Sequence, residues 1–186
     1  MKLLAYGARA FSAYGAALAS RPVLVQSVTA AVIAGAGDVV CQARAAEPSP
    51  RSRAPRAGRG WDAARTARMA AWALAVTPVV SKWFSWLGRA FPTSPLQRML
   101  ADQLLFTPLN VCAFLFTMGL AETGTASGGM RKLQAMPSVL RSNYVVWPAV
   151  QWVNFAFVPP LLQPLAVNVV GLAWAVYLSA VVNSSS

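Results

Sequence analysis

Hydrophobic residues along this chain are gathered into long runs that polar or basic segments separate. The runs cover 22–42, 69–88, 99–121, 144–159 and 161–182. A helix of about 20 apolar residues is long enough to cross the ~30 Å hydrocarbon core of a bilayer. Each of the first three runs has that length. The last two runs are separated by prolines, and they predict either two short spans or one span followed by a kinked interfacial helix. The pattern predicts an all-α bundle with about four transmembrane helices.

The N-terminal segment, residues 1–21, has a different pattern. Its large apolar residues recur at intervals of three, four and seven, which places them on one side of a helix: Leu4, Phe11, Tyr14 and Leu18. The segment has basic residues and no acid, and it is too weakly hydrophobic to span. It is therefore predicted to be an N-terminal amphipathic helix. The helix either lies on a membrane surface as an anchor or targeting element, or docks on the bundle.

An arginine-rich segment interrupts the apolar pattern after the first run. Residues 43–68 hold seven Arg, three Pro and two Gly, and the part from 43 to 60 is predicted to be a flexible Arg/Pro-rich loop. Such a loop either binds anionic lipid such as cardiolipin or simply stays on one side of the membrane and fixes the topology. The whole chain, residues 1–186, is interpreted as a single integral membrane domain that contains this loop.

Composition supports the membrane interpretation. Hydrophobic residues make up 56% of the chain and charged residues 11%, whereas soluble domains carry about 25% charged residues. The net charge is +11, but no charged residue follows Arg141, and the basic residues lie in gaps between apolar runs. Nucleic acid is therefore not expected as a partner. The positive-inside bias would place both basic loops on one side and both chain ends on the other.

Several enzyme classes are excluded by residue type. The chain has no His and two Cys, both within apolar runs, so a zinc site or a hydrolase with a histidine base is not expected, nor is any cofactor. The segment GAGD at 35–38 fits the G-x-G-D motif of intramembrane aspartyl proteases, which need two close carboxylates. Asp102 is the candidate for the second one. We favour the alternative, in which Gly35 and Gly37 allow close helix packing and Asp38 forms interhelical hydrogen bonds.

Polar residues inside the apolar runs are the candidate functional residues, because ionisable or amide groups in a membrane span are costly unless they are paired or hydrated. Four of them share one helix face, because they follow one another at spacings of four, four and three: Asn143, Trp147, Gln151 and Asn154. This face should point inward, toward Asp38, Asp102 or a water-filled path. The set either lines a pore or holds helices together, and it comprises Asp38, Gln42, Asp102, Gln103, Asn143, Trp147, Gln151 and Asn154.

Several motifs together resemble one family. The longest is N-Y-x-x-W-P-x-x-Q-x-x-N-F-x-x-V-P at 143–159, and it follows G-x-G-D-x-x-x-Q at 35–42 and D-Q-x-x-x-x-P at 102–108 in the same order. The sequence resembles, over nearly its whole length, the Mpv-seventeen and twenty-two-kilodalton peroxisomal membrane protein family. The resemblance implies a small integral protein with four membrane helices, in the inner mitochondrial or the peroxisomal membrane. Where members usually carry a basic residue after the V-P motif, this chain has Gln163.

From this resemblance we expect a multi-pass channel that passes small solutes with little selectivity. The alternative is a structural bundle that binds lipid or partners and has no transport activity. Enzymatic activity is not expected. The acid-free N-terminus favours the mitochondrial inner membrane over the peroxisome, and a homo-oligomer is left open.

Overall fold

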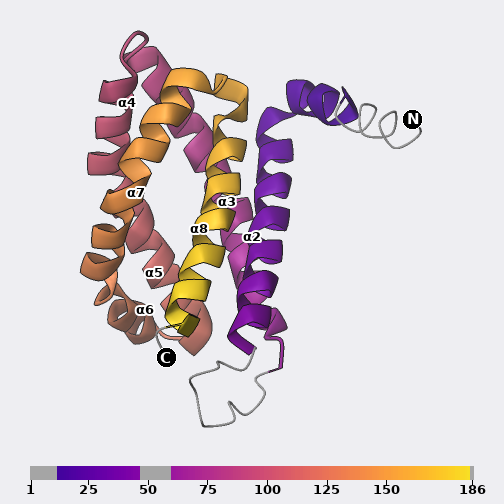
Figure 1. Ribbon diagram of the computed structural model, residues 1–186, viewed down its shortest axis with the longest axis vertical. Coiled ribbons are helices and arrows are strands. Elements are labelled where there is room, and N and C mark those ends of the chain that lie inside the picture. The colour runs from indigo at the N-terminus through magenta and orange to yellow at the C-terminus, as the bar shows by residue number, and fades with distance from the viewer. Residues whose placement is uncertain (1–11, 47–59, 185–186) are drawn as a thin grey trace.

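The protein is a bundle of helices (Figure 1). It is described by a computed structural model for residues 12–46 and 60–184, and every regular element in those ranges is helical. After a helical segment at 12–20, the elements are α2 Pro22–Ala46, α3 Ala63–Ala90, α4 Pro95–Ala101, the π-helical turn η1 Asp102–Phe106, α5 Thr107–Thr123, α6 Ala126–Leu133, α7 Met136–Phe157, the 3₁₀ turn η2 Pro160–Leu162 and α8 Gln163–Ser184. The all-α prediction is confirmed.

Two helices in the described ranges are long and apolar enough to cross a membrane. They are Pro22–Ala45 and the continuous stretch Pro95–Thr123, and a shorter apolar helix covers Pro160–Val176. Helices α3 and α7 are long enough, but Trp, Pro and polar residues dilute their hydrophobic runs. Large apolar side chains nevertheless cover the outside of the bundle; those at least 66% exposed are Val32, Leu104, Leu109, Val145 and Phe157. Such a surface suits lipid better than water.

Helix α2 lies between α3 and α8. Near its start, the side-chain amide of Gln26 donates to the carbonyl of Leu161 over 2.8 Å, and near its end the Cys41 thiol donates to the Ala175 carbonyl over 3.4 Å. These two contacts show that α2 and α8 run parallel. A Cβ added to Gly37 would lie 2.7 Å from Leu172 of α8, so glycine permits this approach. The prediction that glycines in the first run serve helix packing is confirmed at this position.

The turn between α7 and α8 corrects one expectation. Pro159 and Pro160 end α7, and α8 runs back beside α2, so the segment 144–182 forms two antiparallel helices (Figure 1). The described ends of both basic loops lie at one end of the bundle, as predicted. The C-terminal end of α8 lies there too, so the prediction that it lies at the opposite end is wrong. The apolar pattern revealed the break but not the direction of the helix that follows.

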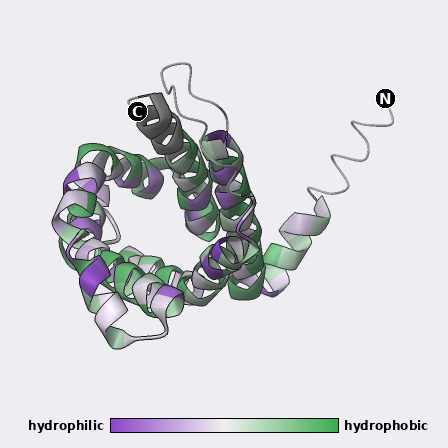
Figure 2. Ribbon diagram, turned by 90° about the horizontal axis from the view of Figure 1, so that it is seen from below, coloured by the Kyte–Doolittle hydropathy of each residue, from purple (hydrophilic) through white to green (hydrophobic). Residues whose placement is uncertain are grey.

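An aromatic core joins α3 and α7, and Met99 and Ala101 of α4 pack against it. The buried residues Phe84, Leu87 and Phe155 form its centre, and the rings of Phe84 and Phe155 meet edge to face at 5.1 Å. Seen along its axis, the bundle is a ring of helices with hydrophobic residues over much of it (Figure 2). This packing places polar residues of α3, η1 and α7 close together at one level of the ring.

The N-terminal helical segment contacts the bundle. The Tyr14 hydroxyl lies 3.3 Å from the Thr29 hydroxyl oxygen on α2, and Leu18 is 3% exposed. The docking alternative is therefore supported for residues 12–20. Leu4 and Phe11 of the predicted stripe lie outside the described residues, as does most of the Arg/Pro-rich loop (47–59).

Candidate functional site

The first group of polar side chains, the Asp38 cluster, joins α2 to the start of α3. Asp38 is 6% exposed, and one of its carboxylate oxygens pairs with the Arg65 Nε at 2.9 Å. The other oxygen accepts hydrogen bonds from the Thr66 hydroxyl and the Gln42 amide, both at 2.7 Å. Gln42 also accepts a hydrogen bond of 2.7 Å from the backbone N–H of Asp62, the residue whose side chain caps α3. The cluster thus fixes the first turn of α3 against α2.

A second group, the amide network, joins α3, η1 and α7. Asp102 is 1% exposed, and its carboxylate accepts three hydrogen bonds of 2.9 Å, from the indole N–H of Trp83 and from the amides of Gln103 and Gln151. Asn154 then donates to the Gln151 oxygen over 3.1 Å. No cation contacts Asp102 within the described residues, so these dipolar donors alone stabilise it.

Local backbone structure explains why Asp102 and Gln103 both point inward. They begin the π-helical turn η1, in which the N–H of Thr107 bonds to the carbonyl of Asp102. Pro108 follows directly; it has no N–H, and its ring would clash with the carbonyl four residues earlier. The widened turn relieves that conflict and allows two consecutive side chains to be buried. Single π-turns of this kind occur often at functional sites.

Neighbouring polar contacts extend the network. The Tyr144 hydroxyl donates to the Gln103 carbonyl at 3.0 Å. Gln163, which replaces the basic residue usual in the resembled family, is 3% exposed and donates to the carbonyls of Val158 and Asn154 at 3.1 and 3.4 Å. It therefore ties the start of α8 to the end of α7.

Two buried oxygen atoms of the network have no hydrogen-bond partner: Gln103 Oε1 and Asn154 Oδ1. An unsatisfied buried acceptor is costly, and most such groups in native structures have a partner or an explanation such as water. The position of Asn154 suggests one, because this residue also borders a cavity that is partly open to the outside of the bundle.

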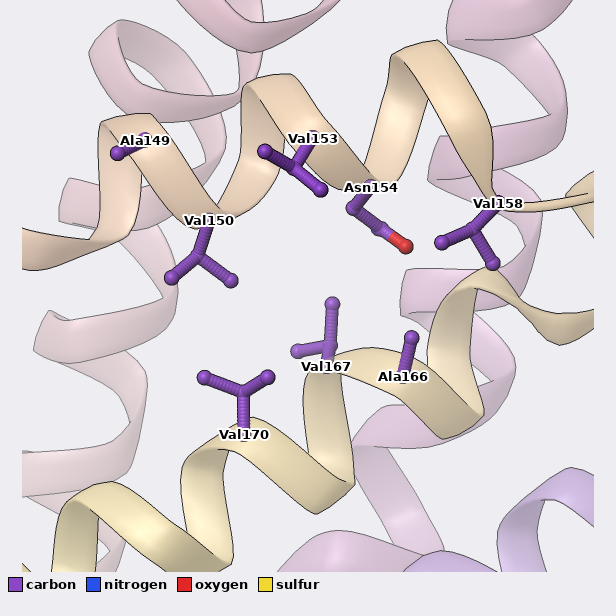
Figure 3. Close-up of a pocket in the computed structure, with 8 residues that line it drawn as sticks. All are labelled: Ala149, Val150, Val153, Asn154, Val158, Ala166, Val167 and Val170. Atoms are coloured by element: carbon purple, nitrogen blue, oxygen red, sulfur yellow. The ribbon is translucent and has the colours of Figure 1, made fainter.

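The cavity lies between α7 and α8 and has a volume of about 390 Å³. Figure 3 shows its side chains, which point from both helices into the space between them. Asn154 is the single polar residue of a lining that otherwise consists of Ala149, Val150, Val153, Val158, Ala166, Val167 and Val170. The cavity is therefore an apolar chamber with one amide at its edge.

The predicted residues divide between these places. Asp102, Gln103, Gln151 and Asn154 come together, whereas Asp38 and Gln42 belong to the other cluster. About 18 residues of α3 separate the two clusters, or roughly 27 Å along the helix, so Asp38 and Asp102 do not form a protease dyad. Asn143 and Trp147 are partly exposed; Trp147 packs over Gly171 of α8.

The sequence did not identify several partners. Trp83 was not among the candidate residues, and Arg65 and Thr66 lie in the basic segment, where no partner of Asp38 was expected. Gln26 was also missed; it accepts a 2.6 Å hydrogen bond from Ser81 of α3. Among the described residues, no group of three or more His, Cys, Asp and Glu could hold a metal ion.

Comparison with known proteins agrees with this architecture. The model of the Mpv17 / PMP22 family matches residues 119–179. Protein sym1 of Aspergillus oryzae is 36% identical, over 92% of this chain and 96% of its own length. The mitochondrial inner membrane protein Mpv17 of Bos taurus is 35% identical, over 90% and 94%, and its namesake in Danio rerio is 34% identical, over 89% and 93%. No solved structure matches. Similarity over nearly the whole length shows that the chain belongs to the Mpv17 / PMP22 family and is a protein of the mitochondrial inner membrane.

Proposed function

We propose that the protein forms a pore for small solutes in the mitochondrial inner membrane, and that the path runs through the cavity between α7 and α8. The observation that carries the proposal is the pairing of this cavity with Asn154, whose buried Oδ1 has no partner. This oxygen is covered in the described conformation, and a movement of α8 away from α7 would let water or a solute in the cavity supply the missing donor. In this account, Asn154 is the lining residue expected from the sequence, and Gln151 stands behind it.

The described conformation corresponds to a closed pore. Apolar constrictions in channels stop conduction because water leaves them, and the side chains that line this cavity are mainly Val and Ala. Opening would require α8 to move relative to α7. Uncharged amides beside the path would then give little preference for the sign of a solute's charge.

The membrane arrangement belongs to the same proposal. We take the long helices of the bundle to cross the bilayer. The four crossings expected from the sequence become five if both α7 and α8 cross. The Arg/Pro-rich loop would lie outside the bilayer, where anionic lipid remains its expected partner. Self-association also remains an expectation.

One observation favours the second candidate, a structural bundle that binds lipid or partners. The side-chain NH₂ groups of Gln151, Asn154 and Gln163 each donate to an oxygen of the protein, as expected for a clamp between helices. In that case the apolar cavity would be filled by an acyl chain and no solute would cross.

Planar-bilayer recording of the purified protein separates the two candidates. We expect unitary currents from the wild type and a several-fold higher open probability for Val170→Ser, because a hydroxyl in the constriction favours wetting. Val169→Ser is the matched control, since Val169 is adjacent on α8 but is 52% exposed and does not line the cavity.

Folded protein that carries no current would favour the structural candidate. Equal effects of the two valine substitutions would place the path elsewhere. Gln151→Glu is a poor test of the lining, because the new carboxylate would lie within about 3 Å of Asp102 and would destabilise the network.

A further inference from the structure

A second cavity lies at the other end of the bundle from the basic loops. It has a volume of about 440 Å³ and is enclosed by the start of α2, the end of α3 and the turn into α8, the end uppermost in Figure 1. Its lining combines basic, hydroxyl, amide and apolar groups: Pro22, Val23, Gln26, Ser81, Lys82, Phe84, Ser85, Arg89, Pro160, Leu161 and Pro164. It shares no lining residue with the cavity between α7 and α8.

Both cations of this cavity come from one face of α3. Lys82, Ser85 and Arg89 follow at spacings of three and four, which puts them in a line along the helix. The two cations are therefore about 10 Å apart along the axis. Both side chains are long and exposed, so they can turn toward a common anion at the mouth of the cavity.

No acid in the described residues neutralises these cations. Each acid there has another partner: Asp38 pairs with Arg65, Asp62 with Arg68, and Glu122 with Lys132. Asp102 is buried in the amide network. Two positive charges thus stand at the mouth of a cavity with no counter-ion from the acids of the described residues.

The other walls of the cavity indicate which anion it would take. Val23, Phe84 and Leu161 make one side apolar, and three prolines leave that side without backbone N–H groups at their positions. Trp86 follows Lys82 by four residues on α3, is 45% exposed and stacks on Trp83 at 5.0 Å. Tryptophan next to a cation is typical of the membrane interface. The cavity thus offers charge at the headgroup level and apolar contact toward the hydrocarbon.

We propose that this cavity is a binding site for an anionic phospholipid, with Lys82 and Arg89 on the lipid phosphate and the apolar wall against its acyl chains. Basic pockets between membrane helices bind such headgroups by this chemistry. A soluble phosphate compound would use the cations but would gain nothing from the wall. The site differs from the Arg/Pro-rich loop, which lies at the opposite end of the bundle.

The test is native mass spectrometry of the full chain in detergent micelles, titrated with phosphatidylglycerol or phosphatidylcholine. Each cation near the surface contributes about fivefold to binding, so Lys82→Gln with Arg89→Gln should weaken phosphatidylglycerol binding roughly thirtyfold. Phosphatidylcholine, whose choline offsets the charge of its phosphate, should bind the wild type more weakly and lose much less affinity in this variant. The matched control is Arg131→Gln with Arg141→Gln, which removes two exposed cations at the opposite end.

A second variant covers the case in which the double substitution does not fold. Ser85→Glu places a carboxylate between the two cations, where helical spacing lets it pair with both, and it should also abolish the preference for phosphatidylglycerol. The proposal is overturned if either folded variant binds phosphatidylglycerol like the wild type, or if the control loses as much affinity. It is also overturned if inorganic phosphate displaces the lipid at equal phosphate concentration, since the site would then be one for soluble anions.

Discussion

Replacement of Asp102 by Leu would remove the acceptor that receives three hydrogen bonds in the amide network. Trp83 reaches one carboxylate oxygen, and Gln103 and Gln151 reach the other, each over 2.9 Å. Hydrogen bonds between membrane helices contribute about 0.6 kcal/mol on average and up to ~1.7 kcal/mol each. Three of them give about 2 to 5 kcal/mol, so Asp102→Leu should lower the free energy of unfolding by that amount.

Asp102→Asn should be milder. An asparagine can keep its oxygen toward Gln103 and Gln151, but its NH₂ group then faces the indole N–H of Trp83. The loss of one hydrogen bond and the opposition of two donors should cost about 1 to 2 kcal/mol. Trp83→Phe removes the opposed donor. It should therefore destabilise the Asp102→Asn protein less than it destabilises the wild type.

The assay is unfolding of purified variants by sodium dodecyl sulfate in mixed micelles, followed by circular dichroism. Glu122→Leu is the control for the loss of a carboxylate, because Glu122 forms a partly exposed ion pair with Lys132 that should contribute under about 1 kcal/mol. The reasoning is refuted if Asp102→Leu is as stable as Glu122→Leu, or if the effects of Trp83→Phe and Asp102→Asn simply add.

Three further predictions concern the rest of the bundle. In the same assay, Asp38→Leu should lower the free energy of unfolding by about 2 to 4 kcal/mol and Asp38→Asn by about 1 kcal/mol. Asparagine still accepts hydrogen bonds from Thr66 and Gln42, and water can solvate the half-exposed Arg65. Equal losses of stability in the two variants would show that the charge of Asp38 is what the cluster requires. Gly119→Ala should destabilise the protein by about 1 to 3 kcal/mol, since its Cβ would lie 2.8 Å from the Gly129 Cα. Gly88→Ala is the control and should be neutral or stabilising, because a Cβ there would have no neighbour within 4 Å. A Gly119→Ala protein as stable as the wild type would contradict the close packing of α5 against α6. Single cysteines at Ser52, Ser127 and Ser184, in a chain lacking Cys41 and Cys112, should all be labelled from one side of the membrane, and labelling of Ser184→Cys from the other side would show that α7 and α8 do not both cross.

Sequence reasoning located the amide network on the α7 side because helical spacing is a local property. Gln151 and Asn154 are three residues apart and had to share a face, and a buried acid was their natural partner. Local spacing could not choose between Asp38 and Asp102. That choice depends on α7 packing against η1, which is a contact between residues about 50 apart in the chain.

The hydrogen-bond and ion-pair partners of Asp38 and Asp102 were missed for the same reason, because they lie on other helices. Arg65 pairs with Asp38 because α3 begins at residue 63, just after the Asp62 cap, and the basic segment concealed this start. Trp83 donates to Asp102 from another helix, 19 residues earlier in the chain, and local spacing does not reveal such a contact. The direction of α8 follows from the contacts of Gln26 with Leu161 and of Cys41 with Ala175, which the prolines at 159 and 160 do not reveal.

The central claim, that solutes pass between α7 and α8, is tested most directly by thiol modification during bilayer recording. In a chain without its native cysteines, Val170→Cys places a thiol in the cavity, and Val169→Cys places one on the outer face of the same helix. A charged, water-soluble methanethiosulfonate reagent should block the current of Val170→Cys within seconds to minutes and leave that of Val169→Cys unchanged. If mass spectrometry shows Val170→Cys fully modified while its current persists, or if both variants are blocked alike, the path does not run through this cavity.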